Sequence, residues 1–548
     1  MKLAKYFSLF SNIFCDERPN VIILIADDFG VGDFRVNQAR GKVPTPNIDR
    51  LGTEGVNFKD AHAGSARCGP SRYMLMTGRY SMQQGKNRIL KAGREPHLGQ
   101  MFKKAGYTTG IFGKSQPLKT ETLNMDQTPE ERAEQRRKVL EWKKISYKNP
   151  QSRTPGDEKR LYQVPGNYTK PVSEVKDFDY DYSFTSGSPC CQPNGYFENG
   201  LQTEPFTEWA IQRTFPEGSI RNDTARINRE EFGVGAYVAA PWFEEETFGE
   251  VLMGNYPRSM VAQKNYDSRT MDEVVSNKLF DFIRSQEAST TPFFTYYGMR
   301  SGHRPFNSPL RFRNTTEAGV VGDMIAEADD IVGNLFKTLE ETGKIHNTLI
   351  LLMSDNGADH SSEFNRILYN HTQNAIDLGG EHWQLKGFKN YNWEGGHRLP
   401  FMWWYPKQFP AKTVEDKVVS YVDVFRTLSD IINYSPSCNE GPDSRSLLPL
   451  LTGASDEIKG PQWIMTHAVY QGIQSIRWNK WKLIPEISEF YNLEQNPDET
   501  VNQFEKEWAK PIIARLQNKL DENLRLIEER EEKTDYGRLN LCFPLKWA

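Results

Sequence analysis

Four uninterrupted apolar runs, each ending abruptly in polar residues, constrain the fold of this 548-residue chain more than any other feature. The runs lack the alternation of apolar and polar residues expected of a strand with one face in water, so they are typical of strands buried on both faces. Helical stretches between them favour parallel pairing in one sheet flanked by helices, an α/β fold. Ligands of such sheets gather at the carboxyl ends of the strands, so we expect the polar residues to meet in one crevice. The runs and the residues that follow them are 21–26 with Asp27 and Asp28, 108–112 with Gly113 and Lys114, 293–297 with His303, and 349–353 with Asp355, Asn356 and Gly357.

The pattern predicts a large domain over residues 18–435 and a smaller C-terminal subdomain over 436–548. In the large domain, apolar residues at helical spacing predict a helix over 322–342 that packs on the sheet. Residues 120–290 show no rhythm of parallel strands and begin with a strongly charged segment, which indicates an insertion. In the subdomain we expect two strands of a short antiparallel sheet, over 474–484 and 490–493, and a helix from about 503 to 531.

Composition describes a soluble globular protein, with 37% hydrophobic and 26% charged residues and a formal net charge of −4. This balance does not favour nucleic acid as a partner, so affinity for any polyanion needs a local basic patch. No apolar run reaches the length of a membrane span. Residues 1–15 carry Lys2, Lys5 and a short apolar run, which resembles a weak secretion signal and predicts a periplasmic or secreted protein.

Oxygen-bearing side chains follow two of the buried runs. Asp27 and Asp28 follow the first, and Asp355 and Asn356 follow the last. Taken alone, Asp27-Asp28 would more often be a turn or a helix cap. Their shared placement after buried strands instead predicts a site for Ca²⁺ or Mg²⁺, because both ions prefer oxygen ligands.

The segment around Cys68 predicts the start of a helix beside a reactive centre. Gly69 lets the backbone approach a ligand closely, and Pro70 suits the first helical turn. Cys68 would then lie where unpaired N–H groups favour an anion or a thiolate, with Arg72 on the same helix face. The alternative for a single cysteine is a buried structural residue.

Cys68-Gly69-Pro70-Ser71-Arg72, with Thr77-Gly78-Arg79 after it, resembles the C-x-P-S-R signature of the type I sulfatases. The resemblance implies an alkaline-phosphatase-like sandwich and a Cys68 that a formylglycine-generating enzyme oxidises to formylglycine, whose hydrate is the nucleophile. It also implies one calcium ion held by Asp27, Asp28, Asp355, Asn356 and the residue at position 68. Phosphatase relatives of this fold commonly have an Asp-His pair where this chain has Asp355-Asn356, and they bind two transition metals, so Asn356 favours the one-metal site.

Three further segments resemble sulfatase motifs in the expected order: 106–114, 302–306 and 385–400. The resemblance implies that Lys114 and Lys389 bind the sulfate group and that His303 donates a proton to the leaving alcohol. Gln116 stands where the family usually has a histidine that helps to eject sulfate. Arg300 and Arg304 are predicted to meet further charged groups of the substrate. Aromatic residues of 179–200 either line the substrate cleft or pack in the core.

These features predict an enzyme that hydrolyses sulfate esters on a carbohydrate. An algal galactan such as carrageenan is the first substrate that we expect, and a glycosaminoglycan is the second. The enzymatic alternative is a phosphonate or phosphate ester hydrolase that uses the same modified cysteine. Outside enzymes, the alternative is an inactive carbohydrate-binding relative, which only Gln116 supports.

Overall fold

The computed structural model describes most of the chain from residue 18 to residue 535. The described residues are 18–81, 95–115, 123–124, 168–169, 178–184, 196–199, 201–204, 206–212, 258–263, 267, 269–303, 308–359, 375–460, 462–468 and 472–535. The possible signal at 1–15 and nearly all of the charged segment after residue 120 lie outside them. Among the described residues, no helix is both long enough and apolar enough to cross a membrane.

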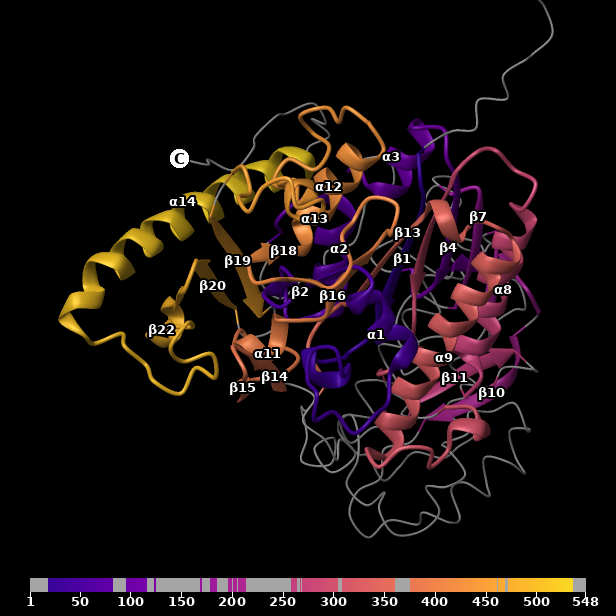
Figure 1. Ribbon diagram of the computed structural model, residues 1–548, viewed down its shortest axis with the longest axis horizontal. Helices are drawn as coiled ribbons and strands as arrows, with labels where there is room; N and C mark the ends of the chain where they lie inside the picture. The colour runs from indigo at the N-terminus through magenta and orange to yellow at the C-terminus, as the bar shows by residue number, and fades with distance from the viewer. Residues whose placement is uncertain are drawn as a thin grey trace, which may run out of the picture.

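A twelve-stranded sheet forms the centre of the molecule (Figure 1). Its central strand, β1 (Asn20–Ala26), pairs in parallel with β12 (Phe293–Gly298) on one side and with β13 (Thr348–Ser354) on the other. Beyond β12 lies β4 (Thr108–Gly113), also parallel. All four strands predicted from the apolar runs are confirmed, and they lie side by side in the order β13-β1-β12-β4.

Both edges of this sheet contain antiparallel strands, so the sheet is mixed although its centre is parallel. Beside β13 lie β16 (Phe401–Trp404), β2 (Val56–Phe58) and β17 (Thr413–Glu415). Beside β4 lie β7 (Tyr180–Phe184), which is parallel to it, and then β8 (Tyr196–Glu198), β9 (Leu201–Gln202), β6 (Tyr168–Thr169) and β5 (Leu123–Asn124).

Helices cover both faces of the sheet and bury alternate residues of β1. Val21, Ile23 and Ile25 face a core formed with α2 (Cys68–Thr77), α3 (Leu98–Lys104) and α12 (Val424–Ile431). Ile22 and Leu24 face the opposite core, formed with α1 (Pro46–Thr53), α8 (Met271–Ser285) and α9 (Gly319–Glu341). The helix predicted over 322–342 is confirmed as α9, and α8 lies beside it within the segment that we assigned to an insertion (Figure 1).

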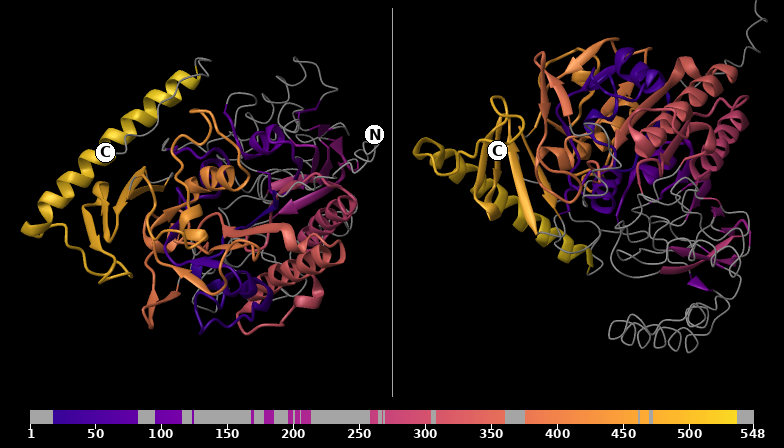
Figure 2. Two further views of the ribbon diagram at one scale, coloured as in Figure 1. Left: turned by 45° about the horizontal axis from the view of Figure 1, so that its top comes forward. Right: turned by 90° about the horizontal axis from the view of Figure 1, so that it is seen from below.

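The C-terminal subdomain has four strands rather than the two predicted. They are β19 (Trp463–Ala468), β20 (Ile473–Trp478), β21 (Trp481–Ile484) and β22 (Glu489–Asn492), all antiparallel. The run 474–484 is a hairpin, because Asn479 takes a left-handed conformation (φ 52°) that turns the chain. The predicted helix is α14 (Lys510–Asp535), which begins later than expected and lies along this sheet (Figure 2).

The small sheet shares its core with the helices around Cys68. Ile476 and Leu483 of the sheet and Leu516 of α14 belong to the same apolar cluster as Tyr73 and Met74 of α2. The short helix α11 (Glu394–His397) and the two-residue strand β3 (Ala61–His62) lie between the two sheets. Smaller pairs of strands are β10 (Phe206–Gln212) with β11 (Arg258–Gln263), β14 (Ala375–Leu378) with β15 (Glu381–Gln384), and β18 (Val419–Ser420) with β3.

Candidate active site

The carboxyl ends of the central strands bring the predicted polar residues together, as the sequence led us to expect. Asp27 and Asp28 follow β1, Lys114 follows β4, and Asp355 follows β13, all with buried side chains. The contacts below link these residues and Lys389, which lies 361 positions after Asp28 in the chain, into one cluster.

Asp28 is at the centre of the cluster. Its Oδ2 accepts a bond from Lys389 Nζ at 2.6 Å, and its Oδ1 accepts one from Asn356 Nδ2 at 2.6 Å. Its backbone is left-handed, with φ 61°, a conformation that aspartate tolerates and that concentrates at functional sites. Burial raises the pKa of Asp28 to about 7, although Lys389 opposes the shift. His303 Nε2 lies 3.8 Å from Asp28 Oδ2, so this histidine faces the cluster.

Asp27 and Asp355 bind the other two cations. Lys114 Nζ donates to Asp27 Oδ2 at 2.6 Å, and Arg72 Nε donates to Asp355 Oδ2 at 2.7 Å. Burial alone would raise the pKa of Asp27, but Lys114 and Arg72 reverse the shift and lower it. Arg72 also donates to the Tyr296 hydroxyl at 3.0 Å, so two bonds fix its guanidinium. No sequence pattern indicated this role for Tyr296.

Cys68 begins α2, as its Gly-Pro context predicted, and its thiol is free and half-buried. Burial would lower the pKa of Lys114 and of Lys389, but neighbouring acidic groups, chiefly Asp27 and Asp28 and also Cys68, raise both. Cys68 therefore lies within electrostatic reach of both lysines. The roles of Cys68 as the nucleophile and of the two lysines as sulfate ligands stay predictions.

The cluster is suited to a hard cation. Among the described residues, Asp27 Oδ1 and Asn356 Oδ1 are buried oxygens without a hydrogen-bond partner. Oxygens of Asp27 and Asp28 and a ring nitrogen of His303 lie within 4.8 Å of one another. A set dominated by carboxylate and amide oxygens suits Ca²⁺ or Mg²⁺ better than zinc. An ion held by Asp27, Asp28, Asp355 and Asn356 would give the two unpaired oxygens a partner.

The predicted substrate-binding residues divide into three groups. Lys114 and Lys389 lie in the cluster, whereas Gln116 and Arg304 lie outside the described residues. Arg300 is fully buried, and its backbone N–H donates to Asp272 of α8 at 2.9 Å. Its charge lowers the pKa of Glu327 of α9, although burial, the larger effect, raises it. Arg300 has no surface to offer a substrate in this structure, which favours a structural role.

Aromatic residues of the described part of 179–200 pack in the core instead of lining a cleft. Tyr182, Phe184, Tyr196 and Phe197 are buried, and the rings of Tyr182 and Tyr196 stack with centroids 5.8 Å apart. This outcome is the packing alternative stated above. Cys190 and Cys191 lie outside the described residues.

Sequence reasoning missed one acidic member of the cluster, Asp359. Its side chain is buried. Its carboxylate raises the pKa of Lys389, an effect second to that of Asp28, and it also raises the pKa of Asp28. The only signal in the sequence is its position four residues after Asp355, in a loop whose path could not be foreseen.

Comparison with known proteins identifies relatives across the whole described core. The family model "Sulfatase" matches residues 19–152 and 213–434, and the model "N-sulphoglucosamine sulphohydrolase, C-terminal" matches 380–525. An N-acetylgalactosamine-6-O-sulfatase of Bacteroides thetaiotaomicron is 27% identical over 80% of this chain and 77% of its own length. The N-acetylgalactosamine-6-sulfatase of Mus musculus is 24% identical over 79% of this chain and 66% of its own length.

A solved structure shares the fold. It comes from work on the metabolism of multiple glycosaminoglycans by Bacteroides thetaiotaomicron and matches with a TM-score of 0.66 at 22% identity. The match covers 92% of this chain and 99% of that one. The predicted alkaline-phosphatase-like sandwich, with its small C-terminal antiparallel sheet, is therefore confirmed.

Proposed function

The chain belongs to the sulfatase family and is a sulfuric ester hydrolase, and from this premise we propose that its substrate is a glycosaminoglycan-type carbohydrate. The first candidate is a 6-O-sulfated N-acetylgalactosamine unit. The observation that carries the proposal is the similarity to the bacterial and mouse relatives, both named for that sulfate ester, across about four fifths of this chain. This order reverses our expectation from the sequence, in which carrageenan came first and glycosaminoglycans second.

The site supports the chemistry through its charges. Lys114 and Lys389 carry buried positive charges within electrostatic reach of Cys68, and in this proposal they bind the oxygens of the sulfate group. Negative charge grows on those oxygens or on the leaving oxygen during transfer, so fixed cations stabilise the transition state more than the free substrate.

Proton transfer falls to His303 in this proposal. A departing sugar alkoxide is a poor leaving group and needs a proton, which an imidazole provides near neutral pH. His303 faces the cluster from the end of β12, with Nε2 3.8 Å from Asp28 Oδ2. This orientation supports His303 as the proton donor.

A modification of Cys68 and a metal ion would complete the proposed site. When present, the formylglycine hydrate at position 68 supplies the oxygen nucleophile, and a calcium or magnesium ion polarises a sulfate oxygen. Asp27, Asp28, Asp355 and Asn356 would hold the ion. Arg72, fixed by Asp355 and Tyr296, would keep a positive charge next to position 68.

Export of the protein is part of the proposal. Cys438 is disulfide-bonded, and disulfides persist in oxidising compartments such as the periplasm or the exterior. The apolar run near the N-terminus supports the same location. A formylglycine-generating enzyme would be the maturation partner.

The test is sulfate release by protein co-expressed with a formylglycine-generating enzyme. The panel holds oligosaccharides with 6-sulfated N-acetylgalactosamine, other glycosaminoglycan fragments, carrageenan oligosaccharides and a phosphonate monoester, and Cys68→Ala is the control. We expect the highest kcat/KM on the 6-sulfated galactosamine unit and no release by the control. Preference for carrageenan would contradict the substrate, and preference for the phosphonate would contradict the reaction. Binding of a glycan without any release would favour the inactive relative.

A further inference from the structure

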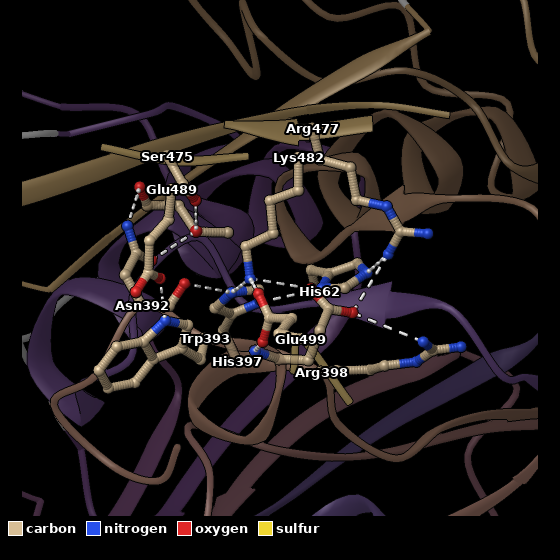
Figure 3. Close-up of polar contacts among 12 residues, drawn as sticks. His62, Asn392, Trp393, His397, Arg398, Ser475, Arg477, Lys482, Glu489 and Glu499 are labelled. Atoms are coloured by element: carbon tan, nitrogen blue, oxygen red, sulfur yellow. Dashed lines mark hydrogen bonds and ion pairs between the residues drawn. The ribbon is translucent and has the colours of Figure 1, made fainter. Parts of the chain in front are cut away.

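A second buried polar network, distinct from the candidate active site, joins the C-terminal sheet to the catalytic domain. Figure 3 shows its centre, where Lys482 points from the small sheet towards His397, His62 and Glu499. Lys482 is fully buried. Its Nζ lies 2.8 Å from Glu499 Oε1, 3.0 Å from Glu394 Oε1 and 3.1 Å from His397 Nε2. The ammonium hydrogen-bonds to Glu394 and His397 and forms an ion pair with Glu499.

The two histidines connect Lys482 to Asp60. His397 Nε2 contacts Lys482 Nζ at 3.1 Å and Asn392 O at 3.4 Å, and His397 Nδ1 lies 3.0 Å from His62 Nδ1. His62 Nε2 in turn lies 2.7 Å from Asp60 Oδ1 and 2.9 Å from a guanidinium nitrogen of Arg477. The result is a single chain of bonds from Lys482 through His397 and His62 to Asp60.

The charges of this network balance without a metal ion. Its buried carboxylates are Asp60, Glu394 and Glu499, and its cations are Lys482, Arg477 and Arg398. His62, Glu394 and His397 come close enough together to bind a metal, but Lys482 already contacts two of them and supplies the positive charge. A metal would add charge that no further carboxylate of the network's described residues offsets, so we interpret the cluster as an ion network.

The network holds two of the segments that carry active-site residues. His62 precedes Cys68 by six residues on one segment, and His397 follows Lys389 by eight residues on the other. The backbones of these segments also bond: Ala63 N donates to His397 O at 2.9 Å, and Asn390 N donates to Ala66 O at 2.7 Å. The His62–His397 bond therefore links the segment carrying the nucleophile to the segment carrying a sulfate ligand.

The turn that carries His397 also supports the metal ligands. Gly357, next to Asn356, donates its N–H to Gly396 O at 2.9 Å. The approach is so close that a Cβ on Gly357 would lie 1.9 Å from Gly395 O. Lys389 N, in turn, donates to Ala358 O at 3.0 Å. A shift of α11 would therefore move Asn356 and Lys389 together.

We propose that Lys482 is a positioning residue for sulfate binding and hydrolysis: from the C-terminal sheet it holds Glu394 and His397, and through α11 it fixes Lys389 and Asn356 against Cys68. This inference rests on the proposed function. It assigns the C-terminal sheet a part in the active site, although Lys482 itself touches none of the reacting groups. Partners that orient a ligand-binding residue typically change affinity or activity by about 10- to 100-fold when they are removed.

The variants separate positioning from folding. Lys482→Met leaves Glu394 and Glu499 without their shared cation, so loss of stability is expected as well. Lys482→Met with Glu499→Gln removes one positive and one negative charge, and the glutamine oxygen can still accept the bond from Glu394 N that Glu499 Oε2 accepts at 2.6 Å. The control is Arg530→Met, which breaks a buried ion pair of α14 with Asp443 beyond the far end of α2.

Two readouts are measured with calcium present. The first is the Kd of inorganic sulfate, measured by calorimetry in a Cys68→Ala background. The second is kcat/KM of the formylglycine form. The melting temperature of each protein is measured as well. We expect the double variant to melt near the parent protein but to bind sulfate about tenfold more weakly and to lose about 10- to 100-fold in kcat/KM. Arg530→Met should lower the melting temperature and leave the sulfate Kd unchanged.

Either of two results would overturn the inference: a double variant with the parent's sulfate Kd, or an Arg530→Met protein that loses sulfate affinity as strongly. Failure of the proposed function can be told apart from failure of this inference. In the first case the parent protein turns over no sulfated glycan, while the sulfate Kd of the variants still tests the role of Lys482. A parent protein that binds no sulfate would contradict both.

Discussion

His467 should make the protein lose stability in mild acid, by an amount that follows from its surroundings. It is the next-to-last residue of β19, where its carbonyl accepts a bond from Ala66 N at 3.0 Å and its ring contacts Gly64 O at 3.2 Å. Burial lowers the pKa of His467 from 6.5 to about 4, although the bond to Gly64 opposes the shift. The unfolded chain therefore takes up a proton between pH 6.5 and pH 4 that the folded protein excludes, so stability falls as the pH is lowered.

The magnitude follows from the two pKa values. Linkage predicts that His467 lowers the free energy of unfolding by about 0.2 kcal/mol at pH 7 and by about 2 kcal/mol at pH 5. Acidification from pH 7 to pH 5 should therefore lower the free energy of unfolding by about 1.8 kcal/mol. The assay is urea unfolding, followed by tryptophan fluorescence, of the parent and of His467→Gln at both pH values. Subtracting the values of the variant from those of the parent removes the contribution of all other titrating groups, because both proteins share them. Relative to it, the parent should lose about 1.8 kcal/mol on going to pH 5. A difference between the two proteins that does not change with pH would refute the reasoning.

Three further predictions concern the active site. Lys114→Met should lower kcat/KM by about 100- to 1,000-fold in a sulfate-release assay, because one fixed charge on the transition state is lost. A parent-like value would contradict the role of Lys114. Gly357→Ala should destabilise the protein by about 3 kcal/mol in thermal melts, since the new methyl group meets the Gly395 carbonyl 1.9 Å away and backbone must move. An unchanged melting temperature would contradict that packing. Removing calcium with a chelator should lower the free energy of unfolding by about 2.7 kcal/mol, compared with protein in free calcium at 100 times the calcium Kd. The reason is that the ion binds only the folded carboxylates, and calorimetry measures the change. Equal melting curves with and without the chelator would contradict the cation site around Asp27 and Asn356.

The centre of the fold and most of the candidate site could be predicted because they depend on local patterns. A run such as 21–26 has no polar residue, so it identifies a strand buried on both faces without knowledge of its neighbours. Parallel pairing then places the ends of such strands at one edge of the sheet. Asp27, Lys114 and Asp355 therefore meet as expected, although no pattern specified that Lys114 would pair with Asp27 and Lys389 with Asp28.

The second network could not be predicted, because its contacts depend on how distant segments pack. His62 and His397 are 335 residues apart, and each alone is an ordinary histidine next to a short element. Lys482 lies among apolar residues of β21, and a lysine is ordinarily exposed to solvent. Its Nζ instead contacts Glu394 and His397 of α11, and the side chain is fully buried. The strand β19 was missed because 463–468 mixes apolar and polar residues without either face being exposed.

The most direct test of the central claim is to correlate the chemical state of residue 68 with the rate of sulfate release. Peptide mass spectrometry would give the fraction of Cys68 converted to formylglycine in batches matured to different extents, and sulfate release from a 6-sulfated N-acetylgalactosamine oligosaccharide would be measured on the same batches. We predict that kcat rises in proportion to the converted fraction and vanishes in Cys68→Ala. Sulfate release that is independent of conversion, or that persists in the variant, would contradict the assignment of Cys68 as the source of the nucleophile.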